Sequence, residues 1–232
     1  MKLATINFSG NNGKTTLSEH LFSTRIPTAL YLSVESINAG NDEVEKLRGK
    51  DYGTLQEEVM MAENAIIDVG ASNVEDFMKL MRQYNGSHEE FDFFVVPAVK
   101  ENKQLEDTLA TIQALSSIGV PAKKIKVVFN KVDVDDIIED DFYPLFAMHK
   151  QNKNFTLNVD AVVHSSEIFK LLRTYKKTIP ELLEDKTDWR VKLREAKTED
   201  DKILAVKMIS MKRLAISAQS NLDQVFKTLT GK

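Results

Sequence analysis

The chain has 232 residues, of which 42% are hydrophobic and 28% are charged, as in an ordinary soluble globular protein. This length suits one α/β domain with a large core and a small extension. The chain contains no cysteine, which excludes disulfide bonds and thiolate metal sites. No apolar stretch approaches the ~18 residues of a membrane span, and the N-terminus runs directly into the first expected strand. We therefore expect a cytoplasmic protein with no signal peptide.

The net charge of −4 is unevenly distributed along the chain. Residues 187–232 contain ten Lys/Arg and six Asp/Glu, a net charge of +4, so residues 1–186 carry −8. An acidic bulk with a mildly basic tail argues against a dominant nucleic-acid surface, and direct nucleic-acid binding stays open.

Residues 7–16 have the composition of a phosphate-binding loop. They follow an apolar run at 3–6, which predicts a buried strand, and precede a helical pattern at 17–22. In this context successive backbone N–H groups and the positive end of the helix bind a phosphate. The usual G-x-x-x-x-G-K-[ST] motif has glycine where this chain has Phe8, so an ordinary turn between strand and helix is the alternative.

The loop assigns expected roles to its residues. Lys14 is expected to contact the β- and γ-phosphates, and the Thr15 hydroxyl to bind Mg²⁺. The expected nucleotide-binding residues of the loop are Gly10, Asn11, Asn12, Gly13, Lys14, Thr15 and Thr16.

Strands and helices alternate along the rest of the chain. Strands are predicted at 29–34, 65–67, 91–96 (ended by Pro97), 125–129 and 160–164, and helices at 54–63, 73–84, 102–118, 166–175 and from 178. The patterns Thr54 to Glu57 and Thr178 to Glu181 are capping boxes, each predicting a helix start. The alternation predicts a doubly wound, mostly parallel sheet of the P-loop NTPase type with a helical C-terminal tail.

Polar residues end several of the predicted strands, where ligands bind in such sheets. Asp68 follows 65–67 as a Mg²⁺-binding Walker-B aspartate does, or else it caps the next helix. Asn130, Lys131 and Asp133 form the N-K-x-D pattern with which GTPases bind guanine. In ParA-like ATPases an Asn at this strand end contacts adenine instead, and an accidental turn is the third interpretation. ATP and GTP both stay open.

The tail carries a heptad pattern, which spaces apolar residues by four and three. Its members are Leu204, Met208, Met211, Ala215, Ala218, Leu222, Val225 and Leu229. We favour a long helix packed on its own domain, because Ile203, Ile209, Ile216 and Phe226 widen the apolar face. We expect a small exposed portion near 225–229. A docking or dimerisation helix is the alternative. The expected division is a nucleotide-binding domain at 1–186 and a helical extension at 187–232.

The motifs together resemble the ParA/MinD group of P-loop ATPases, and most of all the StbB-type plasmid stability proteins, described as MipZ- or MobD-like. The resemblance covers 1–185 and rests on the segments 6–16, 34–38, 67–73 and 94–97. It implies Mg²⁺ with ATP or ADP, an ATP-dependent homodimer, and a protein partner that stimulates hydrolysis.

Two departures from the family pattern concern hydrolysis. Ser9 occupies the position of the family's signature lysine, and Asn11 that of its second glycine. Ser33 replaces the first aspartate of D-x-D, which leaves Glu35 as the acidic Mg²⁺ or water contact. The resemblance therefore implies catalytic roles for Lys14, Glu35 and Asp68 in a slow ATPase, since a missing cation can cost ~10³–10⁵ in rate.

The sequence favours a nucleotide-dependent switch in plasmid stability, partition or positioning. A non-hydrolysing nucleotide-bound scaffold and a GTPase are alternatives. A dethiobiotin-synthetase-like ligase is a third, and it requires a second small-molecule pocket.

Overall fold

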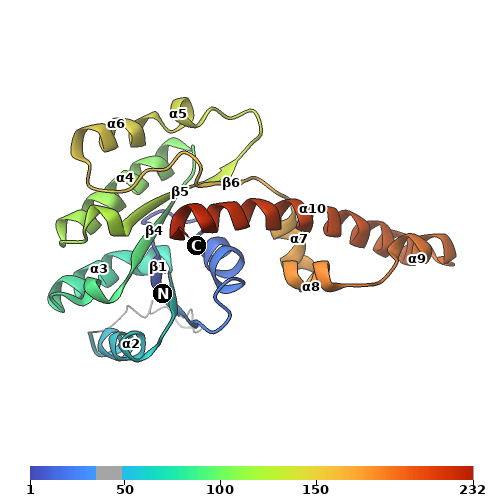
Figure 1. Cartoon of the computed structure of the whole chain (residues 1–232), viewed down its shortest axis with the longest axis horizontal. Helices are drawn as coiled ribbons and strands as arrows, with labels where there is room; N and C mark the ends of the chain where they lie inside the picture. The colour runs from blue at the N-terminus through green and yellow to red at the C-terminus, as the bar shows by residue number, and fades with distance from the viewer. Residues whose placement is uncertain (35–48, 232) are drawn as a thin grey trace, which may run out of the picture.

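A computed structural model describes residues 1–34 and 49–231 of the chain. Within these residues six strands form one sheet in the order β2-β3-β1-β4-β5-β6, and every neighbouring pair is parallel (Figure 1). The strands are β1 (Lys2–Thr5), β2 (Leu30–Val34), β3 (Ala65–Val69), β4 (Phe93–Ala98), β5 (Ile125–Val132) and β6 (Val162–His164). The predicted doubly wound parallel sheet is confirmed.

Helices cover both faces of this sheet (Figure 1). The first is α1 (Lys14–Thr16), which continues as the π-helical η1 (Leu17–Ser23). The others are α2 (Gly49–Met61), η2 (Ala71–Asn73), α3 (Val74–Gln83), η3 (Ser87–Glu90), α4 (Asn102–Ser117), η4 (Ala122–Lys124), α5 (Ile138–Asp141), α6 (Tyr143–Asn152), α7 (Ile168–Tyr175), α8 (Ile179–Glu184), α9 (Trp189–Glu195) and α10 (Glu199–Thr230).

Two apolar cores lie on opposite faces of the sheet. Alternate strand residues belong to different cores, as the two-residue period of a strand requires: Ala4 joins the core under α2, α3 and α4, and Leu3 the core under η1, α7 and α10. Burial on both faces explains why the strands are continuous apolar runs in the sequence.

Several predicted boundaries are wrong, and two of them have a clear physical reason. β4 continues through Pro97 to Ala98, because β1 pairs with β4 only as far as Val95 and no β1 residue needs the N–H that Pro97 lacks. Helix α2 begins at Gly49, so the predicted capping box at Thr54 lies inside it. The helix extends further toward the N-terminus because Tyr52, like Val59, is fully buried. The second capping box is confirmed, with hydrogen bonds between Thr178 and Glu181 in both directions.

The tail helix α10 buries one long stripe. Seven of the eight predicted heptad residues are buried, from Met208 to Leu229, and Ala205 is buried in place of Leu204, which is 43% exposed. The expected exposed portion near 225–229 is wrong, since Val225 is fully buried and Leu229 is 4% exposed. The exposed part of the helix is its N-terminal half. The division of the chain into two domains stays a prediction.

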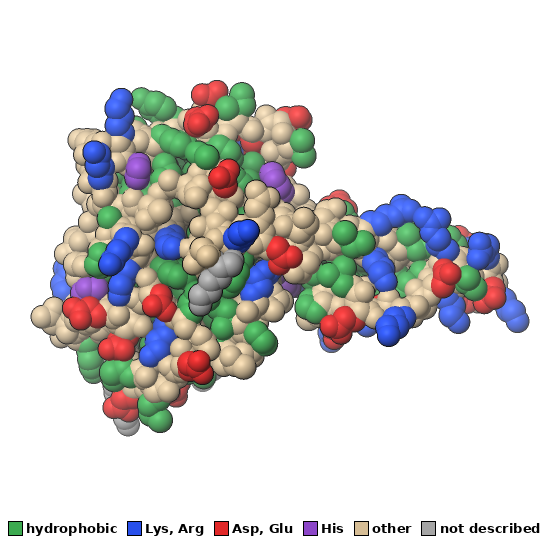
Figure 2. All heavy atoms as spheres, viewed as in Figure 1, with side chains coloured by type: hydrophobic (Ala, Val, Ile, Leu, Met, Phe, Trp, Pro, Cys, Tyr) green, Lys and Arg blue, Asp and Glu red, His purple; other side chains and the backbone are tan. Residues whose placement is uncertain are grey.

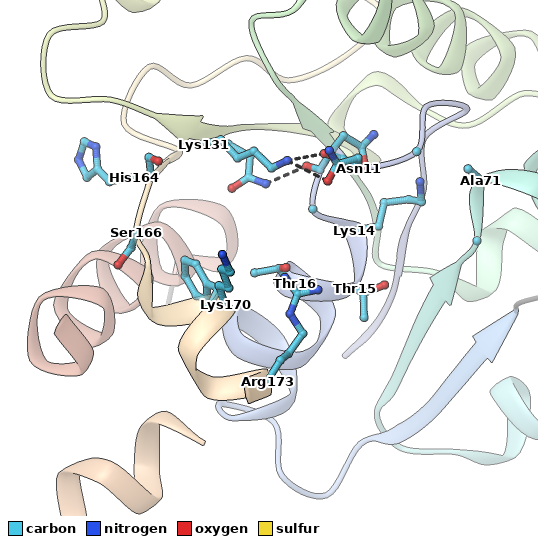
Figure 3. Close-up of a pocket in the computed structure, with 17 residues that line it drawn as sticks. Asn11, Lys14, Thr15, Thr16, Ala71, Lys131, His164, Ser166, Lys170 and Arg173 are labelled. Carbon is cyan, nitrogen blue, oxygen red and sulfur yellow. Dashed lines mark hydrogen bonds between the residues drawn. The ribbon is translucent and has the colours of Figure 1, made fainter. Parts of the chain in front are cut away.

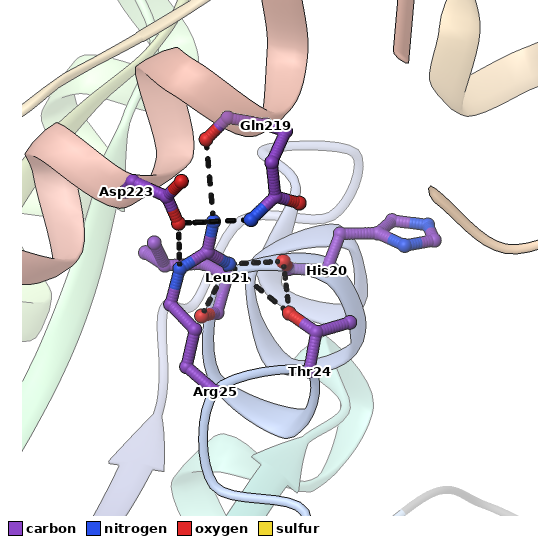
Figure 4. A network of polar contacts seen from close by, with 6 residues as sticks. All are labelled: His20, Leu21, Thr24, Arg25, Gln219 and Asp223. Atoms are coloured by element: carbon purple, nitrogen blue, oxygen red, sulfur yellow. Dashed lines mark hydrogen bonds and ion pairs between the residues drawn. The ribbon is translucent and has the colours of Figure 1, made fainter. Parts of the chain in front are cut away.

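A polar network attaches α10 to the end of η1 (Figure 4). The Arg25 guanidinium pairs with Asp223 at 2.6 Å and also donates to the backbone oxygens of His20 and Leu21. The side chain of Arg25 is only 10% exposed, whereas that of Asp223 is 55% exposed. The network therefore fixes the C-terminal half of α10 against the helix that follows the loop at residues 6–13.

Candidate nucleotide-binding site

A pocket of about 470 Å³ lies at the carboxyl ends of the strands (Figure 3). Every residue of the loop and helix start from Gly10 to Thr16 lines it. The other lining residues are Gly70, Ala71, Asn130, Lys131, His164, Ser165, Ser166, Phe169, Lys170 and Arg173. The pocket thus combines the loop after β1, the loop after β3, the end of β5 and the segment from β6 to α7.

The loop backbone is held by residues of β5. Gly13 has φ of 92°, and a Cβ there would lie 2.0 Å from Asn130 Nδ2, so only glycine fits. Asn130 Nδ2 donates to the Asn12 carbonyl at 2.8 Å, and Lys131 Nζ to the Asn11 carbonyl at 2.5 Å. Asn130 and Lys131 therefore shape the loop, whichever base is bound.

Lys14 is the buried cation of the site. Its side chain is 7% exposed, and Nζ donates to the carbonyls of Asn7 at 3.1 Å and Ser9 at 2.6 Å. Burial lowers the pKa of Lys14 to about 8, although the charge of Asp68 opposes this shift. An ammonium group held mainly by neutral carbonyls is poorly compensated, which suits it to an anionic ligand.

A second feature of the loop also fits a phosphate group. The Asn12 side chain is fully buried, and neither of its polar atoms has a hydrogen-bond partner within the described part of the chain. Buried polar groups without partners are rare, and they often mark a ligand or ion site. The residues present therefore fit the phosphates of a nucleotide.

Asp68 lies deeper than the pocket lining. It is 2% exposed, pairs in register with Thr5 and Ser33, and accepts hydrogen bonds from Thr5 Oγ1 at 3.2 Å and Tyr31 Oη at 3.5 Å. Burial and the charge of Asp68 raise the pKa of Tyr31, which stays a donor. Thr15 is exposed in the pocket. Among the described residues no cluster of three His or acidic side chains holds a metal by itself. Mg²⁺ usually keeps several waters and takes one or two protein ligands. The metal-binding roles of Thr15 and Asp68 stay predictions.

One further predicted residue, Asp133, stands apart from this pocket. Asp133 lies 3.5 Å from Lys100 and lines a separate depression of about 220 Å³ with Asp136. The structure does not bring Asp133 to the loop. Glu35 lies outside the described residues.

Helix α7 contributes pocket residues that sequence reasoning missed. Lys170 and Arg173 are three positions apart, so they share a helix face (Figure 3). Phe169 of the same helix also lines the pocket. Arg173 also affects His20: burial first and the Arg173 charge second lower the pKa of His20 to about 4. The available signal was the pair of basic residues on the helix that follows the last predicted strand. These cations add positive charge on the side of the pocket opposite Lys131.

Comparison with known proteins gives a fold but no family. No family model and no curated protein matches the sequence. The structure is similar to MinD cell division protein of Aquifex aeolicus, with a TM-score of 0.60 and 11% identity over 100% of this chain and 97% of that one. It is also similar to the MinC:MinD complex of that organism (TM-score 0.56, 10% identity, 100% and 96% covered). A third similar structure is septum site-determining protein MinD with Mg-ADP from Pyrococcus horikoshii (TM-score 0.51, 13% identity, 91% of this chain and 93% of that one covered). No helix in the described ranges is long and apolar enough to cross a membrane. At these identities the likeness shows that the chain has the fold of the MinD ATPases.

Proposed function

We propose that the protein binds Mg-ATP at this pocket and acts as a ParA/MinD-like switch in positioning or partition. The observation that supports the proposal best is the buried Lys14 ammonium, which lies at the start of α1 and is held by two loop carbonyls. The fold of solved MinD proteins, one of them with Mg-ADP, agrees with it. Plasmid stability is the proposed setting, from the resemblance to StbB-type proteins, with a protein partner that responds to the bound nucleotide.

The contacts of the N-K-x-D segment favour adenine over guanine. A guanine-binding aspartate must reach the base, but Asp133 pairs with Lys100 outside the pocket. The part of the pocket beyond the loop is lined instead by His164, Ser165 and Phe169. An aromatic ring and small polar side chains accept a purine without selecting the guanine edge.

Calorimetry with ATP, ADP and GTP, each with Mg²⁺, tests the proposal. We expect ATP and ADP to bind at least as tightly as GTP, because Asp133, the residue that would select guanine, lies outside the pocket. GTP binding at least ~10-fold tighter than ATP binding, a difference of about 1.4 kcal/mol, would replace the ATPase by a GTPase. No binding of any nucleotide would remove the proposal altogether.

A non-hydrolysing scaffold is the second candidate, because Ser9 stands where the resemblance expects a lysine. Ser9 is itself buried, and its carbonyl accepts from Lys14, so no cation from this position reaches the pocket. Arg173 and Lys170 are the cations that α7 offers instead.

We expect the purified protein to hydrolyse ATP far more slowly than the ~1–100 s⁻¹ of typical kinases. Phosphate release over hours, with an Arg173→Ala control, measures this rate. A rate of several per second that Arg173→Ala abolishes would show that α7 replaces the signature lysine. A rate indistinguishable from the buffer blank favours the scaffold.

The ligase alternative requires a second pocket, and one of about 580 Å³ adjoins the first across Arg173. Lys176 and Lys177 line it, together with His20. A ligase would turn over ATP only with a second small substrate, whereas the proposed switch responds to a protein. The dependence of turnover on added factors separates the two.

A further inference from the structure

Helix α9 and residues 199–213 of α10 form an arm that projects from the body of the protein (Figure 1). Its base is fixed, because Asp185 Oδ2 accepts from Trp189 Nε1 at 2.7 Å and the Asp185 carbonyl accepts from Lys212. Basic side chains lie along the arm with apolar ones between them (Figure 2). The arm is therefore anchored at its base, and its surface is separate from the pocket.

One stripe of α10 on this arm is exposed in the described part of the chain. Asp200, Ile203, Leu204 and Lys207 are spaced i, i+3, i+4 and i+7, which places them on one helix face. Ile203 is 56% exposed and Leu204 is 43% exposed, and Asp200 and Lys207 are exposed as well. In the ranges 1–34 and 49–231, neither Asp200 nor Lys207 has an ion-pair partner.

The stripe is complementary to a second copy of itself in the opposite orientation. An acid and a base lie at its two ends, and two aliphatic residues lie between them. When two such helices pack antiparallel about a two-fold axis between positions 203 and 204, position 200 of each faces position 207 of the other. Ile203 then faces Leu204. A two-fold interface requires this kind of self-complementary pattern.

We propose that this stripe binds the same stripe of a second copy of the chain, in antiparallel orientation. The pairing would form two ion pairs, Asp200 to Lys207 in both directions, around a covered aliphatic centre. It does not involve the phosphate-binding loop, so it is independent of nucleotide and of the function proposed above. The interface is small, and we expect a dissociation constant on the order of 10 µM.

The tip of the arm argues against a nucleic acid as the occupant. Glu199, Asp200 and Asp201 occupy its first turn and repel phosphates. Exposed aliphatic side chains such as Ile203 are covered by another apolar surface, which a phosphate backbone does not supply. The charge pattern matches a second copy of the chain without further assumptions.

Sedimentation velocity of the full chain from ~1 to ~200 µM without nucleotide tests the pairing. We expect Asp200→Lys and Lys207→Glu each to weaken association at least ~10-fold, because each change places like charges opposite one another. A one-to-one mixture of the two variants is expected to associate like the wild type. In the mixed pair, position 200 of the Asp200→Lys copy is basic and faces position 207 of the Lys207→Glu copy, which is acidic. The other ion pair joins the unchanged Lys207 of the first copy to the unchanged Asp200 of the second.

The matched control is Lys202→Glu, which makes the same charge change as Lys207→Glu on the same helix but off the stripe. It is expected to associate like the wild type. Recovery in the mixture excludes misfolding of either variant as the cause of the loss. A wild type that stays monomeric at the highest concentration overturns the proposal, as does a pair of variants that associate normally or fail to recover when mixed.

Discussion

Replacing Lys14 with alanine is expected to weaken ATP binding at least ~100-fold while the fold stays intact. Hydrogen bonds to charged groups contribute up to about 3 kcal/mol each, and Lys14 is expected to make such contacts with the phosphates. Its hydrogen-bond partners in residues 1–34 and 49–231 are the carbonyls of Asn7 and Ser9. Lowering of its pKa to about 8 means that the buried ammonium costs folding stability below that pH, a cost the variant does not carry. Calorimetry measures the loss, and thermal melting checks the fold.

Two further measurements distinguish the loss of the Lys14 charge from a disturbed loop structure as the cause of weaker ATP binding. Lys14→Gln keeps a donor for the carbonyls but loses the charge, and it should bind ATP as weakly as the alanine variant. Wild-type affinity should fall above pH 8, as free Lys14 loses its proton, by up to ~tenfold per pH unit. Lys103→Ala, a change of an exposed lysine on α4, should have neither effect. Retention of ATP affinity and of its pH dependence in Lys14→Ala would remove the loop from the proposal.

The alternation of strands and helices along the chain and the loop that precedes α1 were predictable because each depends on local sequence. Strands buried on both faces appear as apolar runs, and the loop has glycine at the one position, Gly13, where a side chain collides with Asn130. The expectation that polar residues collect at the strand ends follows from the parallel arrangement alone. The fold class therefore needed no knowledge of distant contacts.

The parts of the site that escaped prediction depend on such contacts. Whether Lys170 and Arg173 face the pocket depends on how α7 packs against the sheet, which no local pattern encodes. The same holds for Asp133, whose ion pair with Lys100 joins residues 33 positions apart. The position of Pro97 inside β4 depends on the shorter neighbour β1. Each of these outcomes is decided by tertiary structure.

The tail illustrates the same limit within one helix. The heptad predicted the buried face correctly from Met208 onward, where α10 packs on the body. At the arm the packing partner is α9, so the buried residue is Ala205 and the predicted Leu204 is exposed. A heptad pattern specifies an apolar stripe, but the neighbouring elements decide how far that stripe is covered.

Replacing Met211 with glutamate is expected to lower the free energy of unfolding by several kcal/mol, roughly 3–5 by analogy with broken buried ion pairs. Met211 is fully buried in the core beneath α10, so the new carboxylate has no water and no partner. For a chain of this size the loss corresponds to a melting temperature lower by roughly 6–20 °C. Thermal unfolding followed by circular dichroism measures the change.

Ile216→Glu is the matched control, because it places the same charge on the same helix at a side chain that is 57% exposed. Its stability should stay within about 0.5 kcal/mol of the wild type. Lys207→Glu provides the opposite contrast, since it is expected to keep the melting temperature and lose association. The two halves of α10 then respond differently: a charge at position 211 lowers the melting temperature, and a charge at position 207 separates the copies. A Met211→Glu protein that melts like the wild type but no longer self-associates would show that the face of α10 around Met211 is an interface in solution and not part of the core.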